Sequence, residues 1–199
     1  MNLPNKLTVS RFFLTAIFMG AVFWRSQLND TLALFLFSIA SLTDYFDGKI
    51  ARSRNLITNF GALMDPLADK ILTCAAFVAL VERGHLVHNE TGVKVHAWMV
   101  IIIVSRELAI TGLRLLAATR QLVLAAERYG KHKTISQMVA IIALLMLDAS
   151  PEWGHWAAVC IQPWLPWFAT IALWVTVMLT FTSGALYLWR NRELYLRDM

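Results

Sequence analysis

The chain has 199 residues, of which 58% are hydrophobic and 16% charged, and its formal net charge at pH 7 is +5. This composition excludes an ordinary soluble domain and predicts an all-α integral membrane protein with one domain, residues 1–199. The sequence contains no basic helix and no base-stacking motif, so nucleic acid is not expected as a partner despite the positive net charge.

Apolar runs predict six membrane-spanning helices. Five of them lie at about residues 7–24, 31–52, 97–118, 134–147 and 168–189, and the third helix begins between residues 59 and 65 and ends near residue 81. No small-residue cleavage site follows the first run, so we expect no cleavable signal. Of the 18 Lys and Arg residues, only Arg25, Arg83 and Lys94 fall in the first, third and fifth connections. The positive-inside rule therefore predicts that both termini and the connection between the second and third helices face the cytoplasm.

A polar cluster opens the first helix, with Asn5, Thr8 and Arg11 at its cytoplasmic end. Two interpretations stay open for it. These residues either form a capped, positively flanked helix end or contact a lipid-linked diphosphate.

Four aspartates flank the connection between the second and third helices: Asp44, Asp47, Asp65 and Asp69. Helical spacing places each pair on one face of its helix. An isolated carboxylate near a bilayer costs about 3 kcal/mol at a helix centre and usually marks function. Four facing carboxylates would repel one another unless two divalent cations balanced them, and oxygen ligands favour Mg²⁺ or Mn²⁺. The third helix also contains Pro66, which fits its first turn or bends it.

The aspartates belong to a longer pattern of fixed residues and spacings, which this chain matches at Asp44, Asp47, Gly48, Ala51, Arg52, Gly61, Asp65 and Asp69. The pattern resembles the signature of the CDP-alcohol phosphatidyltransferases, integral membrane enzymes that build phospholipid head groups. The resemblance implies that the four aspartates hold two Mg²⁺ or Mn²⁺ ions. It also implies that Asp69 takes the proton from the attacking hydroxyl, and that CDP-diacylglycerol is bound by Asn5, Thr8, Gly48, Ala51, Arg52 and Gly61.

The fourth helix contains Arg106 and Glu107, and Arg114 lies two turns further along the same face. A buried Arg106 needs an anion, which can be a carboxylate of the protein or a phosphate. For Arg114, nearer the cytoplasmic end, we favour phosphate binding. Lys70 in the third helix directly follows Asp69, and a charge-balancing or snorkelling role fits it as well as a catalytic one.

The segment Gly130-Lys131-His132-Lys133-Thr134 leads into the fifth helix. Cations at a helix N-terminus oppose the helix dipole, and an anion there would relieve them, although positive-inside flanking is the alternative. Together with Arg106-Glu107, this segment resembles the bacterial glycerol-3-phosphate branch of the family, the phosphatidylglycerophosphate synthases. That resemblance implies an acceptor-phosphate site formed by Arg106, Arg114, Lys131 and Lys133.

The tryptophans before the last helix are typical of an outer interfacial belt: Trp153, Trp156, Trp164 and Trp167. Cys74 and Cys160 lie in or beside apolar runs, and we expect two buried thiols rather than a disulfide.

The expected function is transfer of a phosphatidyl group from CDP-diacylglycerol to glycerol 3-phosphate, at the cytoplasmic side of a bacterial inner membrane. The expected partners are these two substrates, the lipid bilayer and a second copy of the chain in a homodimer. Two alternatives remain. One is the same chemistry with phosphatidylglycerol, serine or inositol phosphate as acceptor, and the other is a divalent-cation transporter, because paired intramembrane carboxylates also occur there.

Overall fold

The computed structural model describes residues 3–24, 29–53, 59–86, 93–119 and 129–192, and within them it contains helices and no strand. Side chains are described at residues 9, 10, 12–24, 29–43, 67, 70–84, 93–117 and 133–192. The elements are α1 (Leu3–Phe23), α2 (Asn29–Ser53), α3 (Asn59–Leu86), α4 (Ala97–Thr119), α5 (Tyr129–Ala149), the 3₁₀ helix η1 (Ser150–Trp153), α6 (Gly154–Cys160) and α7 (Leu165–Arg190).

The six long helices cover the six predicted stretches, with differences at some of their ends, and two short helices are additional. α5 begins at Tyr129, several residues before the predicted start, so Lys131 and Lys133 lie inside the helix and not ahead of it. α3 starts at Asn59, which puts Pro66 in its interior and excludes the first-turn interpretation. The short helices η1 and α6 were not predicted, because the Pro- and Trp-rich segment that forms them has no clear helical period.

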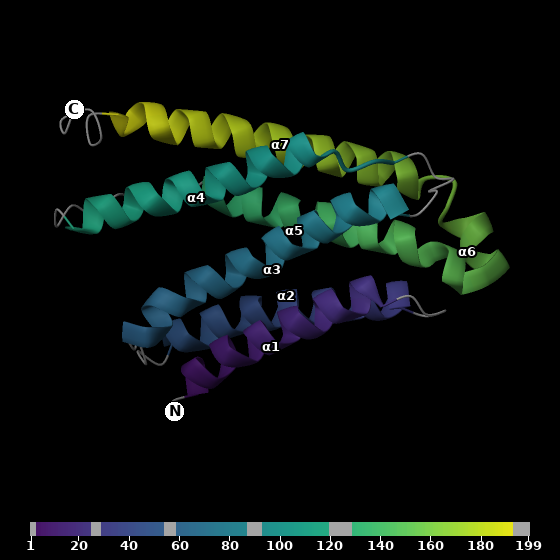
Figure 1. Cartoon of the computed structure of the whole chain (residues 1–199), viewed down its shortest axis with the longest axis horizontal. Helices are drawn as coiled ribbons and strands as arrows, with labels where there is room; N and C mark the ends of the chain where they lie inside the picture. Colours follow the sequence, from purple (N-terminus) through teal and green to yellow (C-terminus); the bar gives the residue numbers. More distant parts are fainter. Residues whose placement is uncertain (1–2, 25–28, 54–58, 87–92, 120–128, 193–199) are drawn as a thin grey trace.

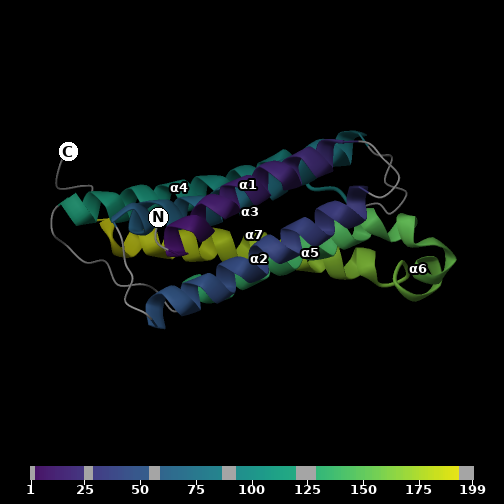
Figure 2. The same cartoon turned by 90° about the horizontal axis from the view of Figure 1, so that it is seen from below.

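The long helices form an elongated bundle in which successive helices run in alternating directions (Figures 1 and 2). α1 packs against α2 and α3, α5 packs against α2, α3 and α7, and α4 packs against α3 and α7. As Figure 1 shows, α2 ends and α3 begins at the same end of the bundle, where α1 also starts and α7 ends. We call this the aspartate end. The opposite end, which carries η1 and α6, is the tryptophan end.

Apolar side chains lie both inside and outside this bundle. The interior is filled by large residues such as Phe18 and Phe37, whose ring centroids are 5.7 Å apart. The outer faces expose further large apolar residues, including Phe13, Leu108 and Ile171. Within the described residues, Lys133–Cys160 and Leu165–Arg190 are long and apolar enough to cross a membrane, and Phe12–Phe23 and Asn29–Thr43 are shorter apolar helical stretches. A helix that is apolar all round is either a core helix or a membrane span, and the exposed apolar faces of these helices are consistent with a membrane protein.

The tryptophan end is held by a polar network that we call the distal clamp: Asp30, Thr31, Arg83, Asp148 and Glu152. The Glu152 carboxylate accepts hydrogen bonds from the backbone N–H groups of Asp30 (3.0 Å) and Thr31 (2.9 Å). It thereby satisfies donors that the first turn of α2 leaves without intrahelical partners. Arg83 of α3 forms an ion pair with Asp30 and lies 3.6 Å from a carboxylate oxygen of Asp148 in α5. The clamp therefore ties together the far ends of α2 and α3, the two helices that carry the aspartates.

Three of the four belt tryptophans, Trp156, Trp164 and Trp167, are exposed at the tryptophan end, as an interfacial role requires. Trp153 differs, because its indole N–H donates a 2.8 Å hydrogen bond to the Thr31 hydroxyl. Neither cysteine forms a disulfide, as predicted. The prediction that both are buried is wrong, since Cys74 is half-buried and Cys160 at the end of α6 is exposed.

Candidate functional site

The two aspartate pairs lie on the two helices that meet at the aspartate end. Asp44 and Asp47 belong to α2, and Asp65 and Asp69 belong to α3. Because both segments are helical, the spacing within each pair places its two residues on one face of the helix. The side chains of all four aspartates lie outside the described part of the chain, so their convergence stays a prediction.

The same holds for the residues predicted to bind CDP-diacylglycerol and for one of the predicted phosphate-binding lysines. The structure assigns Asn5 and Thr8 to α1, Gly48, Ala51 and Arg52 to α2, Gly61 to α3 and Lys131 to α5. Their side-chain environment lies outside the described residues.

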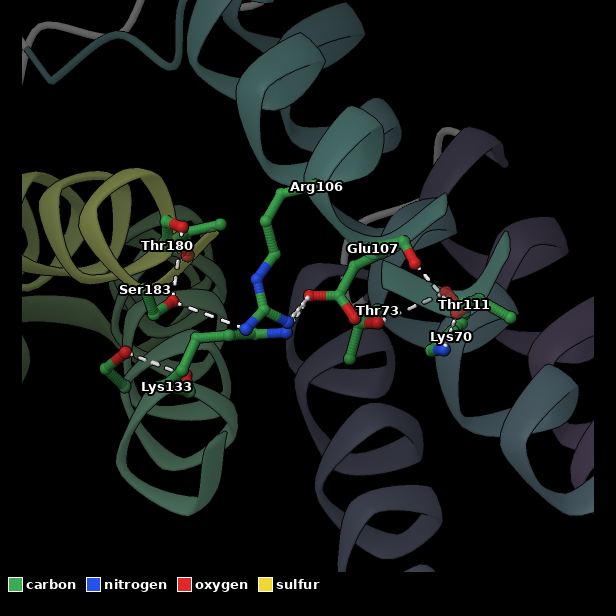
Figure 3. Close-up of polar contacts among 9 residues, drawn as sticks. Lys70, Thr73, Arg106, Glu107, Thr111, Lys133, Thr180 and Ser183 are labelled. Atoms are coloured by element: carbon green, nitrogen blue, oxygen red, sulfur yellow. Dashed lines mark hydrogen bonds and ion pairs between the residues drawn. The ribbon is translucent and has the colours of Figure 1, made fainter. Parts of the chain in front are cut away.

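Deeper in the bundle, three charged side chains converge from two helices. The Lys133 ammonium of α5 forms an ion pair with Oε1 of Glu107 in α4, and the Arg106 guanidinium lies 3.4 Å from that same oxygen (Figure 3). The side chains of Lys133, Glu107 and Arg106 are 5%, 10% and 13% exposed. We call these three residues the basic cluster. Its two cations share one carboxylate oxygen.

α7 supplies the third wall of the basic cluster. The Arg106 guanidinium donates a 3.3 Å hydrogen bond to the Ser183 hydroxyl, which itself donates to the Thr180 carbonyl at 3.2 Å (Figure 3). Both α7 residues are buried. Arg106 therefore bridges α4 and α7, and its orientation depends on both helices.

A second link joins the basic cluster to the aspartate-bearing helix. Lys70 of α3 donates a hydrogen bond to the Thr111 hydroxyl of α4, which donates at 2.7 Å to the backbone carbonyl of Glu107. Because Lys70 directly follows Asp69 in α3, the Lys70–Thr111 contact fixes this part of α3 against α4. Lys70 thus has a positioning contact between helices.

Arg114 has a different environment from Arg106, although both contact α7 as their shared face of α4 predicts. Arg114 is exposed, its Nε lies 3.5 Å from the Tyr187 hydroxyl, and its guanidinium lies 5.8 Å from the centre of the Tyr187 ring. A cation over an aromatic face is stabilised without being neutralised. Arg114 therefore keeps its charge available at the aspartate end.

The basic cluster contains two cations and one carboxylate, so its formal net charge is that of a site that can accept an oxyanion. Removing a charge from water costs several kcal/mol per ion unless an opposite charge and hydrogen bonds compensate it. Glu107 satisfies one of the two alternatives predicted for Arg106, that of a protein carboxylate. Its single shared oxygen has to serve Lys133 as well. A phosphate offers three terminal oxygens and up to two negative charges, so it can engage both cations at once.

The contribution of α7 to the basic cluster was not predicted from the sequence. Thr180, Ser183 and Gly184 are small residues at helical spacing in an otherwise apolar run, and that pattern was the available signal. It predicts close helix packing, but it does not say which helix approaches. The sequence places Glu107 beside Arg106, but it does not predict that Glu107 pairs with Lys133 of α5.

Comparison with known proteins adds a second line of argument. The family described as CDP-alcohol phosphatidyltransferase matches residues 1–182. The chain is 41% identical to a Bacillus subtilis protein named CDP-diacylglycerol–glycerol-3-phosphate 3-phosphatidyltransferase, with 96% of each chain covered. It is 32% identical to a Rickettsia felis protein of the same name, covering 94% of this chain and 93% of the relative. A Mycobacterium tuberculosis protein named probable phosphatidylglycerophosphate synthase is 35% identical, over 93% of this chain and 82% of the relative. Matched over most of its length in both kinds of comparison, and with both aspartate pairs on adjacent helices, the chain belongs to the CDP-alcohol phosphatidyltransferase family.

Proposed function

We propose that this chain transfers the phosphatidyl group of CDP-diacylglycerol to glycerol 3-phosphate, giving phosphatidylglycerophosphate and CMP. The reaction is a step in phosphatidylglycerol biosynthesis. Family membership supports the phosphatidyl transfer, and the names of the relatives support glycerol 3-phosphate as the acceptor. The observation that carries the choice of acceptor is the convergence of Arg106 and Lys133 on one carboxylate oxygen in the bundle interior.

The acceptor phosphate would bind at the basic cluster. Each charge-assisted hydrogen bond contributes about 1.5–3 kcal/mol. Arg106 and Lys133, the two donors, already lie close together because both contact Oε1 of Glu107. Arg114 and Lys131 would extend the site toward the aspartate end, because Arg114 lies two turns beyond Arg106 in α4 and Lys131 precedes Lys133 in α5. An uncharged acceptor alcohol would have no use for this set of cations.

The aspartates would hold the divalent ions. A donor set made only of carboxylates fits a hard cation, so Asp44, Asp47, Asp65 and Asp69 suit two Mg²⁺ or Mn²⁺ ions. Bound there, the ions would neutralise charge that develops on the phosphoryl oxygens. Within the described side chains no group of three or more His, Cys, Asp or Glu residues forms another metal site.

The chemistry is a displacement at phosphorus. The acceptor hydroxyl oxygen forms a bond to the phosphorus of the phosphatidyl group, the bond from that phosphorus to the CMP oxygen breaks, and CMP leaves with the electron pair. Asp69 takes the hydroxyl proton. The cytidine diphosphate would lie against α1, α2 and the start of α3, held by Asn5, Thr8, Gly48, Ala51, Arg52 and Gly61. Gly48 has no side chain to keep a nucleotide away from the backbone, and Arg52 can pair with a phosphate.

The proposal places the six long helices across a bacterial inner membrane, with the aspartate end and both termini on the cytoplasmic side. The bias of Lys and Arg among the connections and the exposed tryptophans at the opposite end support this orientation. A homodimer is part of the same proposal, and chemical crosslinking in membranes would test it. A crosslinked species of twice the mass of the monomer is expected.

An acceptor panel tests the function. The purified protein in liposomes is given CDP-diacylglycerol and Mg²⁺, with glycerol 3-phosphate, glycerol, serine, inositol phosphate or phosphatidylglycerol, and CMP release is measured. We expect release with glycerol 3-phosphate far above that with each other acceptor. Equal release with glycerol would show that the acceptor phosphate is not recognised, and inertness toward the whole panel would contradict the proposed transfer.

A further inference from the structure

Gly184 of α7 lies directly against the stem of Arg106. A Cβ built on Gly184 would stand 2.6 Å from Arg106 Cγ, 3.6 Å from its Cβ and 3.7 Å from its Nε. A Cβ atom essentially never lies within 3.0 Å of another non-bonded heavy atom, so the first distance is a clash, whereas the other two are ordinary contacts. The absence of a side chain at this one position therefore lets Arg106 lie along α7.

A methyl group at residue 184 could be accommodated in two ways, and both would move the guanidinium. Cγ is the second atom of the Arg106 side chain, so rotation about its first bonds swings the whole guanidinium away. The alternative is for α4 and α7 to separate. Ordinary contact begins near 3.4 Å, so a shift of about 0.8 Å is needed.

The contacts that orient the guanidinium leave little room for such a shift. Arg106 reaches Ser183 at 3.3 Å and Glu107 at 3.4 Å, both near the long end of hydrogen bonding. A lengthening of several tenths of an ångström would break both. A misplacement of about 1 Å at a reacting or binding group can cost about 10²-fold in rate.

We propose that Gly184 is a positioning residue for acceptor binding. By leaving space for the Arg106 stem, it holds the guanidinium at Glu107, beside Lys133, where the acceptor phosphate binds. Ser183, the residue before it, fixes the other edge of the guanidinium. This inference rests on the proposed function, since it assigns Arg106 to the glycerol 3-phosphate site.

The test is a double-mutant cycle of Gly184→Ala and Arg106→Ala. The matched control is Gly112→Ala, because Gly112 lies in α4 with nothing within 4 Å of an added Cβ. For each variant, KM for glycerol 3-phosphate and for CDP-diacylglycerol is measured by CMP release. The unfolding temperature is measured in detergent.

Gly184→Ala should raise KM for glycerol 3-phosphate by about tenfold or more, the loss expected for one charge-assisted hydrogen bond. KM for CDP-diacylglycerol should not change, and Gly112→Ala should change neither constant. In the Arg106→Ala background Gly184→Ala should have no further effect, because only the Arg106 Cβ remains and it lies at an ordinary distance. An unchanged KM in Gly184→Ala, or effects that add in the double variant, would overturn the proposal.

The unfolding temperatures separate failure of this inference from failure of the function. If the unaltered protein releases no CMP with glycerol 3-phosphate, the proposed function is wrong and the acceptor role of Gly184 is wrong with it. The contact itself still predicts that Gly184→Ala lowers the unfolding temperature alone but not with Arg106→Ala. If CMP is released normally and Gly184→Ala lowers only the unfolding temperature, the function stands and the positioning role is overturned.

Discussion

Replacing Lys133 with Met removes one charge from the basic cluster while keeping most of the side-chain volume. Lys133 is 5% exposed and pairs with Glu107, so the change affects both stability and acceptor binding. Removing one partner of a buried ion pair costs about 3–5 kcal/mol when the other charge is left alone. Here Arg106 stays 3.4 Å from the same Glu107 oxygen, so we expect the smaller loss of about 1–3 kcal/mol that an impaired hydrogen bond gives.

Lys133→Met should also weaken binding of the acceptor, glycerol 3-phosphate. One charge-assisted hydrogen bond to phosphate contributes about 1.5–3 kcal/mol, which corresponds to a rise in KM for glycerol 3-phosphate of about 10- to 150-fold. CMP release is measured while glycerol 3-phosphate and CDP-diacylglycerol are varied in turn, with Lys94→Met as control, because Lys94 is exposed and outside the helices. A KM for glycerol 3-phosphate that stays within twofold in the folded Lys133→Met protein would show that Lys133 does not bind the acceptor phosphate.

Three further results are expected. Glu152→Gln in the distal clamp should lower the unfolding free energy by about 1–3 kcal/mol, since it weakens the bonds to the first turn of α2, and leave both KM values unchanged in the acceptor assay. A changed KM would show that the two ends are coupled. Asp69→Asn should reduce CMP release by at least about 10²-fold with normal yield of folded protein, because it removes the proton acceptor; activity near that of the unaltered protein would exclude this role. Chelation with EDTA should abolish CMP release and added Mg²⁺ or Mn²⁺ should restore it, whereas full activity in EDTA would remove the metal from the account.

The helices were predictable because apolar runs of this length have few other solutions in a membrane protein. The ends of the helices were less predictable. α5 starts at Tyr129 because a run of polar residues, Gly130 to Thr134, continues the helix beyond the apolar segment, where hydropathy carries no signal. As a consequence, Lys133 projects from a helix and pairs with Glu107.

The site could be predicted as a list of residue types but not as a geometry. Asp44 to Asp69 are close in sequence, and helical periodicity alone assigns them to faces. The basic cluster depends on pairs distant in sequence, Glu107 with Lys133 and Arg106 with Ser183, which only the packing of α4 against α7 and of α5 against α7 brings together. No periodicity encodes that arrangement.

The role of Gly184 also could not be predicted from the sequence. In the sequence it is one glycine in an apolar helix, where it costs helix stability relative to alanine. Its role follows only from the packing of α4 beside it, because the Arg106 stem occupies the space that a side chain at residue 184 would need.

In the proposed mechanism the acceptor phosphate binds between Arg106 and Lys133, while the aspartates of α2 and α3 hold the divalent ions. The most direct test is an experimental structure of the protein with Mn²⁺ and glycerol 3-phosphate. We expect phosphate density within hydrogen-bonding distance of both Arg106 and Lys133, and metal density at the aspartates. Phosphate bound away from Arg106 and Lys133 would show that these two residues do not form the acceptor site.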